Sequence, residues 1–402
     1  MSRYFDHAAT TPVKPTAVQV LTEQMPRLAN PSSLHGSGRR ARLAVDSARS
    51  QVAAAAGADP SEVIFTSGGT EADNLALKGL YWQRRAGDSR RRRILLPGTE
   101  HHAVLDTAEW LEAQHGAELV IIPVDGEGMV DMAALGQLLS HNPETIALVT
   151  VMWANNEIGA VQPIADIGRL CAEAEIPFHT DAVQAFGSLP VSFAESSAST
   201  MALSGHKIGA PVGIGALLVR RDVKLVPVLH GGGQERDIRS GTLDAPGICA
   251  FGAVAEETVA HLPEEAARLA GLRDQLLDAA LELEGVHLCG PDPRISPPLR
   301  MPNNLHIIVD GAEGDSLLFM LDMAGFDTAT GSACTAGVPR PSHVLLAMGL
   351  TEVQARGAQR FSLGWTTTEN DVAALAEALP GIIARSRSAG LAADTPRSAA
   401  QR

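Results

Sequence analysis

The sequence contains, at residues 200–207, the stretch Thr200-Met201-Ala202-Leu203-Ser204-Gly205-His206-Lys207. Its first part is short and apolar, which is typical of a buried strand, and Lys207 follows at the carboxyl end of that strand. In α/β proteins, ligands bind in the crevice outside the carboxyl ends of the strands. The stretch therefore predicts a strand that carries a lysine into a candidate ligand site, although a lysine there could also extend to solvent.

Similar apolar runs alternate with helical patterns through the first part of the chain. Two helical patterns cover residues 39–56, which end before Gly57 as a helix commonly does, and residues 164–173, which begin after Pro163. This alternation implies right-handed crossovers and a mostly parallel sheet covered by helices, so we expect an α/β fold. Besides residues 200–203, the expected strands are 62–66, 94–97, 119–123, 146–151, 177–179 and 214–219.

The pattern changes after Cys249. A long helical stretch at 264–283 precedes a proline-rich connection and shorter pieces, among them a last helix that opens at Thr368 with Asp371 three residues on, like a capping box. A chain of 402 residues is also too long for one ordinary core. We expect a large α/β domain at 15–260, a small α+β domain formed by 1–14 and 261–385, and a flexible tail at 386–402, which is small, polar and basic.

The charge of the chain argues against direct binding of nucleic acid. The net charge is −14, whereas a nucleic-acid binder needs a basic surface to displace counterions from phosphates. Residues 90–93 are all arginine, and such a run could contact RNA or an acidic protein. No aromatic residues are interleaved there for base stacking, so a solvated loop is the favoured interpretation.

Cysteine usage indicates a reducing compartment. The four cysteines lie far apart without a C-x-x-C pair, which predicts neither a zinc site nor a disulfide framework and favours the cytoplasm. The first residues lack the apolar core of a signal peptide, and the most apolar stretch of 19 residues, 201–219, contains His206 and Lys207. We therefore expect no membrane segment.

A glycine turn marks a candidate phosphate site. Ser67-Gly68-Gly69-Thr70-Glu71 directly follows one expected strand and precedes a helical pattern. Glycines at this place would leave backbone N–H groups free at a helix N-terminus, where the helix dipole favours an anion, and Thr70 adds a hydroxyl. Glycine turns are common in α/β proteins, so an ordinary strand-to-helix turn is an equally good interpretation of this stretch alone.

Asp181 ends the strand that precedes the Lys207 strand and is followed by Gln184. Alone, Asp181 could be a helix N-cap. Together, an amine, an acid and a phosphate cup match the needs of pyridoxal 5′-phosphate. The lysine would hold the aldehyde as a Schiff base, and the acid would keep the pyridine nitrogen protonated. We therefore predict that the chain binds this cofactor.

The chain as a whole resembles the cysteine desulfurases, pyridoxal-phosphate enzymes of fold type I within the class-V aminotransferase family. This resemblance implies a mostly parallel central sheet with flanking helices plus a smaller α+β domain. It also implies supply of sulfur for iron–sulfur cluster assembly and for tRNA thiolation. The matching segments are residues 4–12, 67–74, 99–105, 155–159, 204–207, 230–236, 239–242, 331–335 and 360–364.

The resemblance implies a role for each matching residue. Lys207 would carry the cofactor and take the substrate's Cα proton, while His101 would stack on the ring and move protons. Arg360 would clamp the substrate carboxylate with the help of Asn156. Thr242 would come from the partner of a homodimer. The remaining cofactor contacts are Asp181 at the ring nitrogen, Gln184 and Asn156 near the ring hydroxyl, and Gly69, Thr70, Ser204, His206 and the partner-derived Thr242 at the phosphate.

These assignments have plain alternatives. By composition alone, His102 is as good a candidate as its neighbour His101. Arg360 could be a structural salt-bridge partner, and Thr242 could cap a turn.

Cys334 is the residue that would distinguish cysteine desulfuration from the reactions of related pyridoxal-phosphate enzymes. Small residues surround it in Gly331-Ser332-Ala333-Cys334-Thr335-Ala336-Gly337, so the loop can move and the sulfur is unshielded. As a thiolate, Cys334 would take sulfur from L-cysteine as a persulfide, leave L-alanine, and pass the sulfur to an acceptor. The implied acceptors are an iron–sulfur scaffold, an apoprotein or a tRNA-thiolation enzyme. The other cysteines, Cys171, Cys249 and Cys289, are interpreted as small apolar residues.

The segment after Cys334 resembles the long-loop branch of the family, and residues 152–157 and 234–239 resemble actinobacterial housekeeping members. Three other functions stay open. A selenocysteine lyase or an aminotransferase would keep the cofactor and change the reaction. A dimeric docking partner in cluster assembly would have lost its chemistry.

Overall fold

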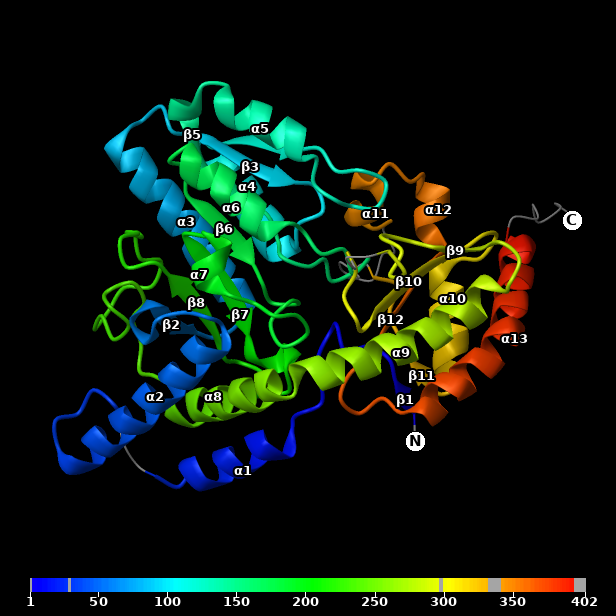
Figure 1. The fold of residues 1–402 in the computed structure, drawn as a ribbon, viewed down its shortest axis with the longest axis horizontal. Coiled ribbons are helices and arrows are strands. Elements are labelled where there is room, and N and C mark those ends of the chain that lie inside the picture. Colours follow the sequence, from blue (N-terminus) through cyan, green and yellow to red (C-terminus); the bar gives the residue numbers. More distant parts are fainter. Residues whose placement is uncertain (1, 28–29, 296–298, 332–340, 394–402) are drawn as a thin grey trace, which may run out of the picture.

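The computed structural model describes residues 2–27, 30–295, 299–331 and 341–393. These residues form a large lobe built on a central sheet and a smaller lobe that holds both ends of the described chain (Figure 1). Cys334 lies outside the described residues. None of the helices in these ranges combines the length and the apolarity needed to cross a bilayer.

The large lobe contains a seven-stranded sheet, which confirms the predicted α/β class. Neighbouring strands β3–β4, β3–β5, β5–β6 and β6–β7 are parallel, whereas β8 is antiparallel to both β7 and β2. All seven expected strands form. In sheet order they are β2 (Val63–Thr66), β8 (Gly215–Val219), β7 (Thr200–Ser204), β6 (Phe178–Asp181), β5 (Ile146–Thr150), β3 (Arg93–Pro97) and β4 (Glu118–Ile122).

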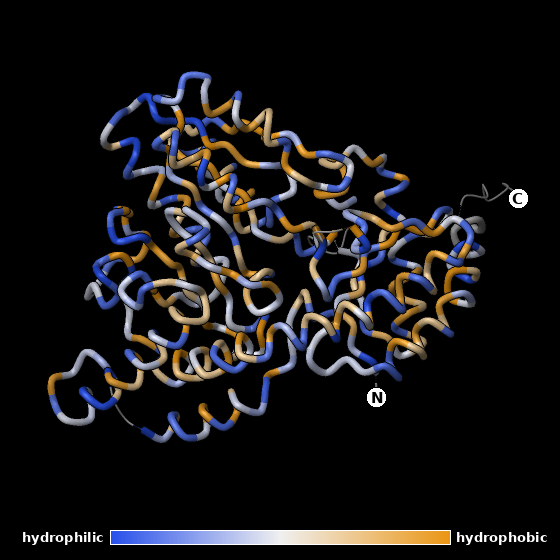
Figure 2. The backbone as a smooth tube through the Cα atoms, viewed as in Figure 1, coloured by the Kyte–Doolittle hydropathy of each residue, from blue (hydrophilic) through white to orange (hydrophobic). Residues whose placement is uncertain are grey.

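Helices cover both faces of this sheet, so the central strands are buried on both sides. Along β8, Leu218 packs into the core that includes Phe251, while its neighbour Leu217 packs into the core that includes Tyr81. In the hydropathy tube of Figure 2, apolar and hydrophilic residues alternate along the helices, as expected for helices with one buried face. The helices are α1 (Pro15–Gln24), α2 (Gly36–Ala55), α3 (Gly69–Gly87), α4 (His102–His115), α5 (Met132–Ser140), α6 (Ile164–Glu173), α7 (Phe193–Ser196) and α8 (Ala245–Ala260), with 3-10 turns η1 (Pro60–Glu62), η2 (Pro143–Thr145) and η3 (Gly205–Lys207).

The smaller lobe has its own core around Phe5, Leu276 and Phe361. Its sheet has the order β12-β10-β9 and is antiparallel, and a two-stranded parallel pair joins β1 to β11. The elements are β1 (Arg3–Tyr4), β9 (Val286–Leu288), β10 (Asn304–Val309), β11 (Phe326–Asp327), β12 (Ala358–Ser362), α9 (Leu262–Leu281), α10 (Gly314–Met323), α11 (His343–Ala347), α12 (Glu352–Arg356) and α13 (Glu369–Ala393).

Two expectations about the ends of elements need correction. Helix α2 begins at Gly36 rather than at residue 39, because His35 caps it by accepting from the N–H of Gly38. The flexible tail does not begin at residue 386, because α13 continues to Ala393. Ser386 is buried and Arg387 donates to the backbone oxygens of Asp310 and Glu284 at 2.8 and 2.6 Å. The predicted domain boundaries themselves stay a prediction.

Two further sequence features behave as expected. Thr368 and Asp371 exchange the hydrogen bonds of a capping box, at 3.0 and 3.2 Å, before α13. Residues 90–92 of the arginine run lie in the connection into β3, as the loop interpretation predicted, and Arg93 is the first residue of that strand. There Arg90 pairs with Asp88 at 2.8 Å, and Arg91 donates to the backbone oxygen of Ile146 at 3.3 Å.

Candidate active site

A cavity of about 450 Å³ lies at the carboxyl ends of β6 and β7. Its walls come from the large lobe, from the N-terminal segment at Asp6, and from Ala329, Gly331 and Arg360 of the smaller lobe. Ten of the twelve candidate site residues line it: Gly69, Thr70, His101, Asn156, Asp181, Gln184, Ser204, His206, Lys207 and Arg360.

The glycine turn forms one end of this cavity. Gly68 has φ 152°, a backbone conformation that favours glycine, and Gly69 is the first residue of α3. A Cβ on Gly69 would lie 2.6 Å from Cγ2 of Val183, so the close approach of these two segments requires glycine. The hydroxyl of Ser204 is buried and has no hydrogen-bond partner among the described residues. This end therefore offers a helix N-terminus and a free hydroxyl to an anion.

Asp181 is buried at the end of β6. Its Oδ1 accepts from the N–H of Val183 at 2.8 Å, and burial raises the pKa of the carboxyl, against the opposing effects of His101 and Lys207. The alternative of a helix N-cap does not hold, because the next helix in the described chain, α7, begins only at Phe193. The carboxylate is left to face the cavity.

Lys207 follows β7 on the 3-10 turn η3 and is half-buried. Its Nζ donates to the backbone oxygens of Ala8 and Ala9 at 2.6 and 2.9 Å. Burial, followed by the positive charge of Arg360, lowers the pKa of this amine to about 8. Lys207 therefore does not extend to solvent. With this pKa, a large fraction of the molecules carry a neutral Lys207 amine at a pH only slightly above the physiological value.

His101 and His102 differ in where their rings lie. His101 lines the cavity as the N-cap of α4, where its Nδ1 accepts from the N–H of Ala103 at 3.1 Å, so a neutral ring carries its proton on Nε2. Burial lowers the pKa of His101, with Asp181 opposing this effect. His102 bonds to Asp106 at 3.0 Å, and its ring centroid lies 4.6 Å from that of His343. The structure therefore favours His101 over His102.

Arg360 is already paired. Its Nη2 lies 2.7 Å from Oδ1 of Asp6, and its Nη1 donates to the backbone oxygen of Asn156 at 3.1 Å. The Nε atom has no partner in the part of the chain that the structure describes. The alternative of a structural salt bridge is thus realised, on a residue that also lines the cavity. Gln184 is likewise engaged, donating to the backbone oxygen of Ala8 at 2.9 Å.

Sequence reasoning missed Asp6, Asp73 and Glu100. Asp6 lies within the matching segment 4–12, and Asp73 lies one helical turn after Thr70 on α3, so both carried a signal. Asp73 lines the cavity and lies 3.2 Å from Nε2 of His179. Burial raises the pKa of both Asp73 and Glu100 well above the usual values, and the charge of Asp181 adds to the effect on each. Burial thus favours the protonated form of both acids, whose pKa values also respond to the charge of Asp181.

The two other candidates do not join the site within the described residues. Thr242 is exposed and does not line the cavity. Cys334 cannot be placed, but the preceding Gly331 lines the cavity. Cys171 and Cys289 are buried as expected, and burial raises the pKa of each thiol to about 12. In the described ranges, no group of three or more histidine, cysteine or acidic side chains is placed to hold a metal ion.

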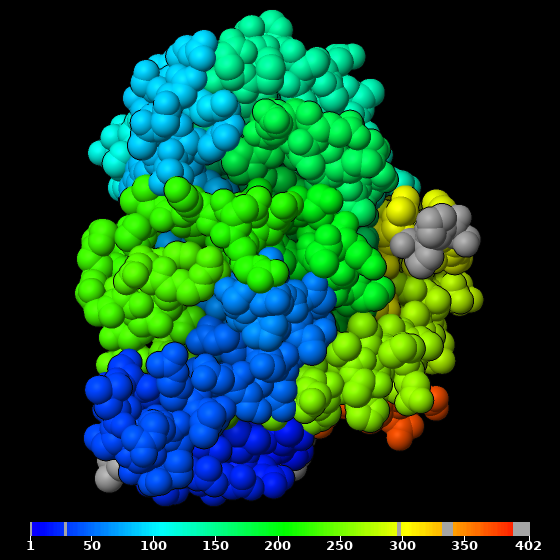
Figure 3. Space-filling model, turned by 60° about the vertical axis from the view of Figure 1, so that its left-hand side comes forward, coloured from blue at the N-terminus to red at the C-terminus, as the bar shows by residue number. Residues whose placement is uncertain are grey.

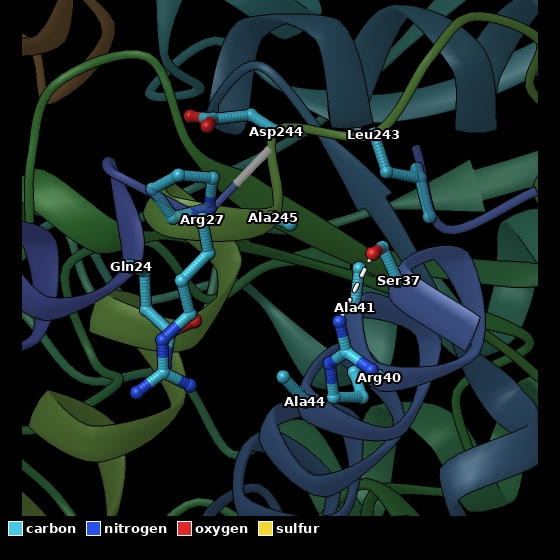
Figure 4. A pocket seen from close by; sticks show the side chains of 10 residues that line it. Gln24, Arg27, Ser37, Arg40, Ala41, Ala44, Leu243, Asp244 and Ala245 are labelled. Carbon is cyan, nitrogen blue, oxygen red and sulfur yellow. Dashed lines mark hydrogen bonds between the residues drawn. The ribbon is translucent and has the colours of Figure 1, made fainter. Parts of the chain in front are cut away.

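A second cavity, of about 550 Å³, lies beside Thr242 between α1, α2 and the start of α8 (Figure 4). Arg40 donates to the hydroxyl of Ser37 at 2.9 Å on one side, and Leu243 and Asp244 face it from the other. Figure 3 shows this side of the molecule, with the blue N-terminal helices below the green segments that follow β8. Among the candidate site residues that the structure describes, none lines this second cavity.

Comparison with known proteins gives a consistent picture. The profile of the family described as aminotransferase class-V matches residues 3–375. A protein from Mycobacterium tuberculosis named IscS-like cysteine desulfurase is 50% identical over 391 residues, 97% of this chain and 98% of that protein. The solved structure of a NifS-like protein has a TM-score of 0.87 at 34% identity and covers 96% of this chain and 100% of that one. A structure described as SspA in complex with cysteine has a TM-score of 0.76 at 33% identity and covers 90% and 99%.

Proposed function

The chain belongs to the aminotransferase class-V family, as its motifs predicted, and we propose that it is a pyridoxal-phosphate-dependent cysteine desulfurase. It would convert L-cysteine to L-alanine and carry the removed sulfur on Cys334. The observation that carries the proposal is the meeting of Lys207, Asp181 and the glycine turn in one cavity. The named desulfurase at 50% identity supports the choice of reaction within the family.

The residues of the cavity fit pyridoxal 5′-phosphate. The unpartnered hydroxyl of Ser204, the turn at Gly69 and the side chains of Thr70 and His206 suit a phosphate, and Asp181 suits a protonated ring nitrogen. Gln184, Asn156 and His101 would contact the ring. When bound to Lys207, this cofactor supplies an electron sink for charge that develops at the substrate's Cα. Each of these contacts is part of the proposal.

Lys207 would move the Cα proton. An amine whose pKa is about 8 is partly neutral at neutral to mildly alkaline pH, which a general base requires. Its two backbone acceptors at Ala8 and Ala9 would hold Nζ in place between proton transfers.

Arg360 would bind the substrate carboxylate. The guanidinium lines the cavity, and its Nε has no partner among the described residues. The substrate carboxylate would displace Asp6, which makes one printed contact with Arg360, and would bind with two parallel hydrogen bonds. Asn156 would assist from its place beside Arg360. The exchange of one carboxylate for another would leave the charge of Arg360 balanced throughout.

Cys334 would be the nucleophile. Its thiolate would attack the sulfur of L-cysteine, so that an S–S bond forms while the C–S bond breaks and its electron pair stays with the substrate carbon. A proton delivered to that carbon, together with the return of a proton to Cα by Lys207, would complete L-alanine, and His101 would deliver or remove protons through Nε2. The proposal is supported by Gly331, which lines the cavity and precedes Cys334 by three residues in the sequence.

The proposal extends to partners. The enzyme would be a cytoplasmic homodimer in which Thr242 reaches the phosphate of the other subunit, which suits its exposed position outside its own cavity. Persulfide sulfur would pass to an iron–sulfur scaffold or apoprotein, in line with the IscS-like name of the relative, and to a tRNA-thiolation enzyme.

The direct test is product analysis after reconstitution. Purified protein is incubated with the cofactor, its absorbance when linked to lysine is recorded, and L-alanine and sulfide formed from L-cysteine plus a thiol reductant are measured, with Lys207→Ala as the matched control. Equal amounts of both products from wild type alone support the proposal. Formation of a keto acid instead of L-alanine would indicate an aminotransferase. Turnover of selenocysteine but not of L-cysteine would indicate a selenocysteine lyase. A protein that takes up no cofactor would be a docking protein.

A further inference from the structure

Residues 230–242, which we call the linking segment, connect β8 toward α8 and end in the exposed Thr242. At their centre, the N–H of Glu235 donates to the backbone oxygen of Arg239 at 3.0 Å, and the reverse bond measures 3.2 Å. Two of the three residues inside this turn, Arg236 and Asp237, have φ values of 53° and 57°. Side chains other than glycine adopt that conformation at a cost, so outside contacts must hold the turn.

Glu235 provides the first such contact. Its carboxylate is almost fully buried and forms a bidentate pair with Arg49 of α2 at 2.6 and 2.8 Å. Oε2 of Glu235 also accepts from the N–H of Phe65 at 2.9 Å, and the Arg49 guanidinium lies 4.7 Å from the centre of the Phe65 ring. This pair therefore ties the linking segment to the strand that runs into the glycine turn.

Arg239 provides the second contact. Its Nε lies 2.9 Å from Oε1 of Glu71, whose other oxygen accepts from the N–H of Ser67 at 2.7 Å. The linking segment is thus fixed on both sides of the Gly68–Gly69 turn. From Arg239 the chain has only two residues to reach Thr242, and Gly241 is held in turn by Gln234 at 2.8 Å. The position of Thr242 is consequently set by the two ion pairs.

These contacts matter more for Thr242 than for the glycine turn of the same chain. Without Glu235, the turn would keep the pairing of β2 with β8 and the bond between Glu71 and Ser67. The centre of the linking segment would lose its buried anchor. A buried ion pair contributes little net stability because its desolvation offsets the attraction, so its effect falls mainly on which conformation is held.

We propose that Glu235, through its pair with Arg49, is a positioning residue for the cofactor of the other subunit. It holds the linking segment so that Thr242 reaches the partner's cofactor phosphate. This proposal rests on the proposed function, which supplies the cofactor and the dimer. It adds Glu235 as the residue through which cofactor binding in one subunit depends on the conformation of the linking segment in the other. Loss of the pair weakens cofactor binding in the partner subunit and leaves the site of its own subunit intact.

The first experiment measures cofactor affinity in homodimers. Glu235→Gln keeps the shape and the acceptor for Phe65 but removes the charge, and we expect it to bind pyridoxal 5′-phosphate about tenfold more weakly, the scale of one lost charge-assisted hydrogen bond. Arg49→Lys, which keeps charge without the bidentate geometry, serves if that variant does not fold. The matched control is Glu265→Gln, which removes the 2.7 Å pair with Arg268 on α9. Cofactor affinity equal to wild type in both Glu235→Gln and Arg49→Lys overturns the proposal.

The second experiment places the substitution in one subunit only, using two affinity tags. In heterodimer one, Glu235→Gln is in one chain and Lys207→Ala in the other. In heterodimer two, both changes are in one chain opposite a wild-type chain. Each has a single Lys207, and the cofactor linked to it is followed by absorbance and by its dissociation rate. We expect wild-type behaviour in heterodimer one and about tenfold faster loss in heterodimer two.

Three results contradict the proposal: the reverse pattern, faster loss in both heterodimers, or faster loss in neither. The dissociation rate of the cofactor is measured without the reaction. If heterodimer two alone loses cofactor faster but wild type forms no L-alanine, the proposed function is wrong and the role of Glu235 stands. A monomeric wild type overturns the dimer and this inference together.

Discussion

Nη2 of Arg360 lies 2.7 Å from Oδ1 of Asp6. The guanidinium proposed to bind the substrate carboxylate is therefore already paired with a carboxylate of the chain itself. Asp6 then acts as a competitor that the substrate must displace, and it neutralises a buried cation until the substrate arrives. This relationship makes the strength of substrate binding a balance between two carboxylates.

Asp6→Asn should therefore lower the KM for L-cysteine. The amide keeps the shape of Asp6 but gives up the charged competition, and we expect a decrease of about threefold, within the range of a partly exposed ion pair. Initial rates over a range of L-cysteine concentrations give the value. Arg360→Lys, measured alongside, should raise KM, because a lysine cannot hold a carboxylate with two parallel hydrogen bonds. An increase of KM in Asp6→Asn would show that Asp6 orients Arg360 instead of competing for it.

Uptake of the cofactor by the apoprotein should accelerate as the pH rises through about 8. Only the neutral amine of Lys207 is nucleophilic, and burial followed by the charge of Arg360 lowers its pKa to about 8. The neutral fraction therefore grows across that pH and is nearly complete above it. Stopped-flow absorbance between pH 6.5 and 10 measures the rate. A midpoint near the ordinary lysine value of about 10.4 would mean that the site does not perturb Lys207.

His101→Gln should lower turnover far more than His102→Gln. General acid–base groups commonly contribute about 10²-fold or more, and His101 lines the cavity with Nε2 free to carry a proton. His102 contacts Asp106 and His343 instead, so its substitution should change kcat less than about twofold. Comparable losses in both variants would remove the distinction that the structure makes between these neighbours.

Asp73→Asn should stabilise the apoprotein at neutral pH. Burial, with the charges of Asp181 and Glu100, raises the pKa of Asp73, so the folded protein holds a proton that the unfolded chain releases near the ordinary value of 3.8. The stability from this group is present below that pH and is lost as the pH rises. Asparagine mimics the protonated acid and does not titrate. We expect Tm to rise by about 2 °C at pH 7.5 and to change little at pH 4, as measured by calorimetry. A lower Tm at pH 7.5 would indicate an ionised Asp73.

The strands and the residues at their ends could be predicted from the sequence, because short apolar runs and the residue after each run are local features. Lys207, Asp181 and the turn at Gly69 were found in this way, and the structure places all three in one cavity. The antiparallel direction of β8 was not visible, since a buried strand has the same pattern in either direction.

The features that were missed depend on contacts between distant segments. The Asp6–Arg360 pair joins residues 354 positions apart, and the acids Asp73 and Glu100 acquire their pKa shifts only from burial around Asp181. The extension of α13 past Ser386 was hidden because small polar residues resemble a tail until other parts of the same lobe contact them. The composition of a segment indicates whether it is exposed or buried on average, but it does not identify the distant residues that the segment contacts.

The central claim is that the thiol of Cys334 carries the reaction, and one comparison tests it most directly. L-alanine release from L-cysteine plus reductant is measured for wild type, for Cys334→Ala and for the buried control Cys249→Ala, after equal cofactor absorbance has been confirmed in all three. The account predicts that Cys334→Ala loses at least about 10²-fold in rate, on the scale of a lost nucleophile, while Cys249→Ala keeps most of its activity. Equal rates in wild type and Cys334→Ala would contradict it.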